Sequence, residues 1–152
     1  MKYRVIYNFA FYKAGFTLVE LMLVVSLMVL LGVLVFPISV SFYQTQIIND
    51  VQAGLTASLR ESQMLAISGK DDSSFGVYLQ DGSYTLFTGE SYLGRDENKD
   101  EIVSIAPNVS VDGPTEIIFS QLTGLPNVSE TVVLSFGNKT RQIEIMPSGN
   151  ID

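Results

Sequence analysis

The side chains of this 152-residue chain that could do chemistry are carboxylates, amines and hydroxyls, because the chain has no histidine and no cysteine. An imidazole base, a thiolate nucleophile, a disulfide and the usual zinc ligands are therefore all excluded. The sequence also has no nucleophile elbow and no glycine loop of the kind that cradles phosphate. We therefore expect that the protein is not an enzyme and that it carries no cofactor.

One acidic loop has the spacing of a calcium ligand set. Asp96, Asn98 and Asp100 alternate in the stretch GRDENKDEI, and oxygens at alternate positions of such a loop can turn toward one hard cation. However, Glu101 stands where the loop needs a glycine, and Pro107 stands where the bidentate glutamate should be. We favour a solvated acidic loop without metal, with calcium at Asp96, Asn98 and Asp100 as the alternative.

A further carboxylate stands out because its surroundings are apolar. Glu20 is the only charge in the 25 residues from 16 to 40. A helix of that length rises about 37 Å, which exceeds the roughly 30 Å hydrocarbon core of a bilayer, so we expect a transmembrane helix over 16–40. An ionised carboxylate inside such a helix costs about 2 to 3 kcal/mol or more and is normally paired. Glu20 is therefore expected to pair with an amine, unless it stays hydrated near the membrane interface.

The charges on either side of the apolar run differ in sign. Three basic residues precede the run: Lys2, Arg4 and Lys13. Basic flanks stay on the cytoplasmic side, so we expect the N-terminus inside and the rest exported. Without residues 1–15 the chain has six basic and sixteen acidic residues, a net charge of −10. Such a charge repels phosphate backbones, and Lys139 and Arg141 form only a small basic pair, so we expect no nucleic-acid partner.

Residues 15–20 carry a resemblance to a known family. The stretch GFTLVE, followed by the long apolar run, resembles the class III signal of type IV pilins and type II secretion pseudopilins. In that family a membrane-embedded prepilin peptidase cuts after the glycine and methylates the new N-terminal phenylalanine. The resemblance implies a leader over 1–15, cleavage between Gly15 and Phe16, N-methylation of Phe16, and pairing of Glu20 with an amine of its own or a neighbouring subunit.

Pro37 lies inside the apolar run. A proline in a helix has no N–H to donate and leaves the carbonyl of Val33 free, which a bilayer helix tolerates as a kink. In pilins, a proline at the matching place bounds a stretch that loosens when the helix enters the filament. The resemblance implies a helix hinge between Gly32 and Pro37, and a plain kink is the alternative.

The helix is predicted to continue beyond the apolar run as an amphipathic segment over 41–68. Apolar residues recur at steps of three and four on one face, and polar residues occupy the other. The apolar positions are Ile48, Val51, Leu55 and Leu59. Gly69 supplies the helix stop.

The remainder, 69–152, is predicted to be a β-rich globular domain. Asp81-Gly82 and Gly137-Asn138 are tight-turn signals between apolar runs. The predicted strands are 76–80, 83–88, 102–106, 116–120, 131–136 and 141–146. A helix followed only by strands indicates an α+β fold in which an antiparallel sheet packs on the helix.

The order of these elements extends the resemblance. A helix ending in RESQMLAIS, a hairpin around VYLQDGSYTLF, a later IIFSQLTG and a terminal RQIEIMPSGNI resemble the GspH/FimT group of H-type minor pseudopilins and related minor pilins. This implies a pilin-like fold and a subunit that is assembled into a secretion pseudopilus or type IV pilus, where it aids filament initiation and protein secretion. The implied partners are prepilin peptidase, other pilins or pseudopilins, and the assembly platform of the inner membrane.

The same resemblance places the protein in the inner membrane. It would cross once, with the N-terminus in the cytoplasm and the globular domain in the periplasm or outside the cell. The alternatives are a minor pilin displayed for adhesion or DNA uptake, and a signal-anchored protein that is never processed. The export signal is shared by secretion, pilus and competence machines, so it does not select one of them.

Overall fold

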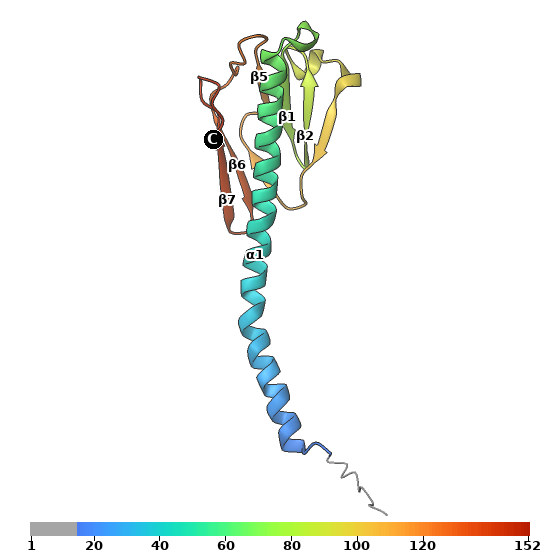
Figure 1. Cartoon of the computed structure of the whole chain (residues 1–152), viewed down its shortest axis with the longest axis vertical. Helices are drawn as coiled ribbons and strands as arrows, with labels where there is room; N and C mark the ends of the chain where they lie inside the picture. Colours follow the sequence, from blue (N-terminus) through green and yellow to red (C-terminus); the bar gives the residue numbers. More distant parts are fainter. Residues whose placement is uncertain (1–14) are drawn as a thin grey trace, which may run out of the picture. The chain divides into compact units, whose positions relative to one another are not determined.

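The computed structural model describes residues 15–152, except for the side chains of Leu34, Pro37 and Ile38. The basic residues Lys2, Arg4 and Lys13, and the predicted leader up to residue 14, lie outside the described residues. The chain divides into two compact units, Met1–Ser39 and Val40–Asp152. Helix α1, Leu18–Ile67, has residues in both units (Figure 1).

The described part of the first unit is the N-terminal portion of α1. Its large apolar side chains are exposed all round the helix; Leu21, Leu27 and Leu31 each expose half or more of their surface. The unbroken stretch of described side chains in this portion ends at Val33. Among the described residues, no helix is both long enough and apolar enough to cross a membrane. The transmembrane helix predicted over 16–40 therefore stays a prediction.

The second unit begins with the amphipathic portion of α1, as predicted. Ile48, Leu55 and Leu59 are fully buried, and Val51 is half-buried. The helix ends at Ile67, one residue before the predicted end. Gly69 follows with a φ of 67°, a left-handed conformation that glycine adopts without strain, so the predicted helix stop is confirmed.

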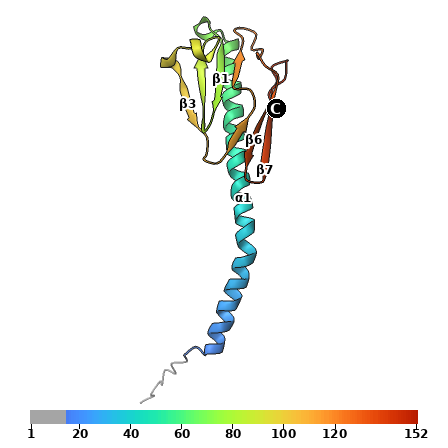
Figure 2. The same cartoon turned by 180° about the vertical axis from the view of Figure 1, so that it is seen from behind.

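Strands follow the helix and form two antiparallel sheets within the described part of the chain (Figures 1 and 2). The first sheet has the order β3-β2-β1-β5, with β1 at Phe75–Gln80, β2 at Ser83–Thr88, β3 at Glu101–Ser104 and β5 at Glu116–Phe119. The second sheet has the order β4-β6-β7, with β4 at Ser110–Asp112, β6 at Thr131–Phe136 and β7 at Lys139–Glu144. Three short 3-10 helices lie in the connections: η1 at Lys70–Asp72, η2 at Tyr92–Gly94 and η3 at Glu97–Lys99. The α+β fold, with a long N-terminal helix packed on antiparallel strands, is confirmed.

Two details of the strand prediction are wrong. The strands form two sheets instead of one, and the three-residue strand β4 was not predicted. Both hairpins are confirmed, because Gln80 pairs with Ser83 across the first turn and Phe136 pairs with Lys139 across the second. The strands predicted at 102–106 and 141–146 begin and end one or two residues earlier than expected, at Glu101–Ser104 and Lys139–Glu144.

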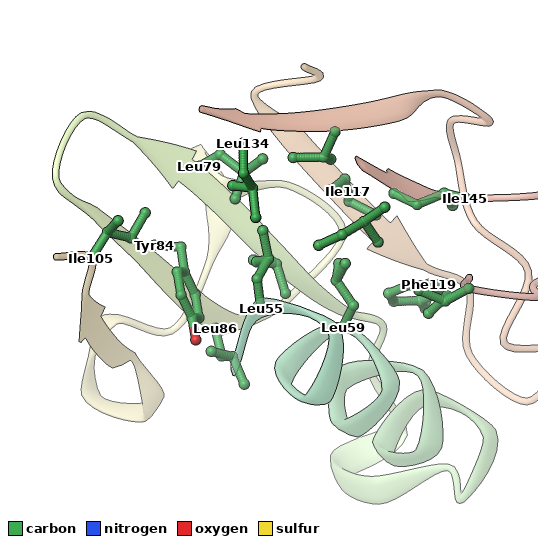
Figure 3. Close-up of a cluster of buried hydrophobic side chains, with 14 of the residues drawn as sticks. Leu55, Leu59, Leu79, Tyr84, Leu86, Ile105, Ile117, Phe119, Leu134 and Ile145 are labelled. Carbon is green, nitrogen blue, oxygen red and sulfur yellow. The ribbon is translucent and has the colours of Figure 1, made fainter. Parts of the chain in front are cut away.

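The core of the second unit lies where α1 meets both sheets. Figure 3 shows Leu55 and Leu59 projecting from α1 among side chains of both sheets. Leu86 and Phe119 come from the first sheet and Leu134 from the second, and all three are buried. A single apolar face of the helix therefore holds the two sheets together, at roughly 1.5 to 3 kcal/mol for each large side chain that is fully buried.

Candidate functional site

The predicted processing site lies at the start of α1. Phe16 exposes 86% of its surface, and a Cβ added at Gly15 would meet nothing within 4 Å. Both residues of the predicted cleavage bond are therefore open to an approaching enzyme. The helix begins at Leu18, so Phe16 and Thr17 precede it and Glu20 lies in its first turn.

Glu20 occupies a position that the helix start itself favours. The Glu20 N–H donates to Thr17 Oγ1 at 3.2 Å, and the Leu21 N–H donates to the Thr17 carbonyl at 3.1 Å, so Thr17 caps the helix. A threonine followed three residues later by a glutamate is the spacing of a capping box. A carboxylate in the first turn also faces the positive end of the helix dipole. Sequence reasoning missed this cap, although the Thr-x-x-Glu spacing is its signal.

The predicted hinge lies within α1. The helix is unbroken from Leu18 to Ile67, so both Gly32 and Pro37 are in helical segments. The side chain of Pro37 lies outside the described residues, and a Cβ added at Gly32 would meet nothing within 4 Å. The hinge between Gly32 and Pro37 stays a prediction.

The three residues of the calcium alternative are engaged in other bonds. Asp96 Oδ1 accepts hydrogen bonds from the main-chain and side-chain nitrogens of Asn98, both at 3.2 Å, and so caps η3. Asp100 Oδ2 accepts from Arg95 Nε at 2.7 Å. Within residues 15–152, no group of three or more acidic side chains is placed to hold a metal ion. The arrangement therefore gives the calcium alternative no support.

Arg95 organises the acidic loop through an aromatic stack. The rings of Tyr78 and Tyr92 are parallel, with centroids 3.7 Å apart, and the Arg95 guanidinium lies 3.8 Å from the centre of the Tyr92 ring. The rings of Phe87 and Tyr92 are nearly perpendicular, with centroids 5.6 Å apart. The hydrogen bond from Arg95 to Asp100 raises the pKa of Arg95. The stack fastens the loop after β2 onto strand β1, and sequence reasoning did not foresee it, because these residues lie far apart in the sequence.

The small basic pair near the end of the chain has a structural use. Arg141 Nε donates to Asn49 Oδ1 at 2.9 Å, which joins β7 to α1, and another Arg141 nitrogen donates to the Thr140 carbonyl at 3.0 Å. Lys139 is half-buried at the start of β7. This geometry gives Arg141 a role in packing that needs no nucleic acid.

Polar residues of α1 also hold the C-terminal segment. Arg60 donates to the main-chain oxygen of Ile151 at 2.7 Å. Gln63 Nε2 donates to the main-chain oxygens of Gly124, at 3.0 Å, and Gly149, at 2.7 Å. The sequence pattern indicated only that polar residues occupy this face of the helix. It did not identify these contacts, because main-chain acceptors leave no signature in residue types.

Comparison of the chain with protein-family models, with curated proteins and with solved structures finds no match. The fold itself, a long N-terminal helix packed on antiparallel sheets, is consistent with a pilin-like fold and is shared by other α+β proteins.

Proposed function

We propose that the protein is a prepilin-like minor subunit of a type II secretion pseudopilus or a type IV pilus. Prepilin peptidase would cut it after Gly15 and methylate Phe16. The processed chain would then enter the filament, where it aids filament initiation and protein secretion. This role requires no catalytic site and no cofactor in the chain itself.

One observation carries the proposal: the stretch GFTLVE of residues 15–20 begins a helix whose apolar side chains are exposed on all sides. Exposing large apolar side chains to water costs roughly 1.5 to 3 kcal/mol for each one. An exposed apolar surface of this extent marks a contact with a membrane or with another protein. In this proposal lipid surrounds the apolar side chains before assembly. The helices of neighbouring subunits replace the lipid in the filament.

In this proposal the apolar run 16–40, taken as a sequence, is a single-pass anchor in the inner membrane. The basic residues before Gly15 keep the N-terminus in the cytoplasm, and the acidic second unit lies in the periplasm or outside the cell. The partners would be prepilin peptidase, other pilins or pseudopilins, and the assembly platform.

Glu20 would act at the assembly step. Cleavage after Gly15 creates a positive α-amino group four residues before Glu20, which is about one helical turn. A carboxylate in an apolar environment gains most from an opposite charge, so pairing with the amine of a neighbouring subunit would fix the axial register between helices.

Mass spectrometry of the membrane fraction tests the proposal. The full chain is produced with and without an active prepilin peptidase, and its N-terminal peptide is sequenced. With the active peptidase we expect the chain to begin at N-methylated Phe16. A Gly15→Val variant, whose larger side chain obstructs cleavage, should keep its leader. An uncut wild-type chain in the presence of active peptidase would overturn the proposal.

A further inference from the structure

Strand β3 forms an open edge of the first sheet. It pairs with β2 from Glu101 to Ser104, and no other described strand lies on its far side; Figure 2 shows β3 at the outer edge of the sheet. Ile102 on this strand exposes 67% of its surface. Proteins block edge strands with charges, bulges, prolines or very short length; β3 is four residues long, and within it only Glu101 is charged. The edge is therefore suited to pairing with another strand.

A hollow of about 260 Å³ lies between α1 and the end of β3. Val51 and Gly54 line it from the helix, and the segment 103–106 lines it from the sheet side, with Tyr84 between them. Because Gly54 has no side chain, the helix leaves room here for an apolar group of about the size of a valine or leucine. Asp50 supplies the one charge at its border.

A second hollow of about 360 Å³ lies further along α1, at the start of β3. Leu65, Leu86 and Phe87 are among its apolar lining residues. Its charged lining residues are Glu61, Lys70, Asp71, Lys99 and Glu101.

The charges of this second hollow do not cancel. Lys99 Nζ lies 2.9 Å from Asp71 Oδ2, so these two charges neutralise each other. Lys70 is then the only cation left against Glu61 and Glu101, which form no ion pair within the described residues. A lining that combines apolar side chains with an excess of negative charge suits the methylene stem and the positive end group of a lysine or an arginine.

Both hollows lie between α1 and the open edge of β3, and we name this surface the α1–β3 seam. We propose that the α1–β3 seam docks an extended basic segment of a partner protein, which adds a strand to β3. In a strand, alternate side chains face the same side at a rise of about 3.3 Å per residue. One such side chain, apolar, would fill the hollow at Gly54, and a basic one would lie between Glu61 and Glu101.

The negative charge of the second unit favours a positively charged partner. Residues 40–152 contain six basic and fifteen acidic residues, a net charge of −9. A second copy of the same unit would bring further negative charge to a seam bordered by Asp50, Glu61 and Glu101, so a basic partner is favoured over self-association. This inference concerns the second unit alone and does not rest on cleavage at Gly15.

Hydrogen exchange on the full chain in detergent micelles tests the inference. The probe is a short extended peptide in which valine and lysine alternate at every second position, so that both lie on one face, with threonine at the positions between them. Its counterpart has glutamate in place of lysine. We expect the lysine peptide to slow exchange of the β3 amides at 101–104 and to bind about tenfold more tightly than the glutamate peptide, since one well-placed charge contact changes binding by about that factor.

Two variants separate docking at the seam from general attraction to an acidic protein. Gly54→Leu fills the first hollow, and its Cβ would lie 3.5 Å from the Tyr84 hydroxyl, an ordinary contact. An unchanged urea unfolding midpoint is the check that this variant keeps the fold. Glu101→Gln removes one carboxylate from the second hollow. Each of these two variants should bind the lysine peptide severalfold more weakly than the wild type. Glu130→Gln changes an exposed carboxylate outside the seam and should bind the peptide as tightly as the wild type.

Three results would overturn the inference. The first is equal binding by Gly54→Leu, Glu101→Gln and Glu130→Gln. The second is protection at another strand while the β3 amides exchange unchanged. The third is protection of β3 without peptide together with a dimer mass, because the occupant would then be a second copy of the chain.

Discussion

The side-chain nitrogen of Gln63 lies 2.7 Å from the main-chain oxygen of Gly149 and 3.0 Å from that of Gly124. One residue of α1 thus holds two connections that are distant in sequence, and Arg60, one turn earlier, holds the carbonyl of Ile151 in the same way. All three acceptors belong to the main chain. The helix therefore fastens these segments by their backbone, and the identity of the loop side chains matters less than their conformation.

We predict that Gln63→Ala lowers the free energy of unfolding of the second unit by about 1 to 3 kcal/mol, because it leaves two carbonyls without their donor. The change is measured by urea unfolding of the full chain in micelles, followed by tyrosine fluorescence. Gln46→Ala is the control, since Gln46 is exposed in the same helix and its side chain makes no hydrogen bond in the described structure. Equal unfolding midpoints for the two variants would contradict the assignment.

Gly124→Ala should destabilise the same unit by about 1 to 3 kcal/mol for two reasons. Gly124 has a φ of 62°, which alanine adopts at a cost, and an added Cβ would lie 2.5 Å from Ile67 Cγ1. Shortening the neighbour in the double variant Gly124→Ala, Ile67→Ala should make the loss smaller than the sum of the two single changes. Additive losses in the urea midpoints would show that the clash with Ile67 is absent.

The ion pair between Lys99 and Asp71 makes a pH-dependent contribution to stability. Its hydrogen bond lowers the pKa of Asp71 below the ordinary value of 3.8 and raises the pKa of Lys99 above 10.5. A lowered carboxyl pKa stabilises the fold above about pH 4 and loses this effect as pH falls through the folded-state value. A raised amine pKa stabilises below about pH 10 and loses this effect as pH rises through its folded-state value.

We therefore predict that the stability difference between the wild type and Asp71→Asn is constant from about pH 5 to pH 9 and disappears at both extremes. Asparagine tolerates the left-handed conformation of residue 71, where φ is 57°, so the variant removes the charge and keeps the backbone. Urea midpoints of both proteins, measured from about pH 2 to about pH 12, provide the measurement. A difference that persists below pH 3 would mean that the ion pair is not its source.

The stack of Tyr78 and Tyr92 predicts a measurable coupling between them. In a double-mutant cycle with Tyr78→Leu and Tyr92→Leu, the coupling free energy should be about 0.5 to 1.5 kcal/mol. Tyr92→Leu should also speed hydrogen exchange over residues 89–100, because Arg95 loses the ring beneath it. Tyr92→Phe keeps the ring and should leave exchange near the wild-type rate. Zero coupling would contradict the stacked geometry.

Two substitutions of Glu20 separate hydrogen bonding by its side chain from charge pairing. Glutamine at residue 20 keeps the length and hydrogen-bonding capacity of the side chain but removes its charge, whereas alanine removes both. If Glu20 pairs with an α-amino group, both variants should be cut after Gly15 and both should be depleted from sheared filaments on immunoblots. Normal incorporation of Glu20→Gln together with loss of Glu20→Ala would mean that the side chain acts through hydrogen bonds and not through its charge, since both variants keep the main-chain N–H that donates to Thr17 Oγ1.

The sequence by itself determined the local structure. Alternating apolar residues and the glycines at 82 and 137 specify the strands and hairpins, because a side-chain period of two and a left-handed turn are local properties. Steps of three and four from Ile48 to Leu59 predicted the helix face that is buried. Residue types alone also indicated the candidate processing stretch at Gly15 and Phe16, with Glu20 after it, and that site stays a prediction.

Only the tertiary structure decided which strands pair and which polar residues bond. After β5 the chain turns at Leu122 and Gly124, both with positive φ, and the next long strand, β6, joins the second sheet. A strand pattern does not name its partner, so sequence reasoning expected one sheet. The bonds from Arg60 and Gln63 end on main-chain oxygens, and the bond from Arg95 to Asp100 and the stack on Tyr92 depend on how a loop folds. These contacts become definite only when packing brings distant segments to within hydrogen-bonding distance.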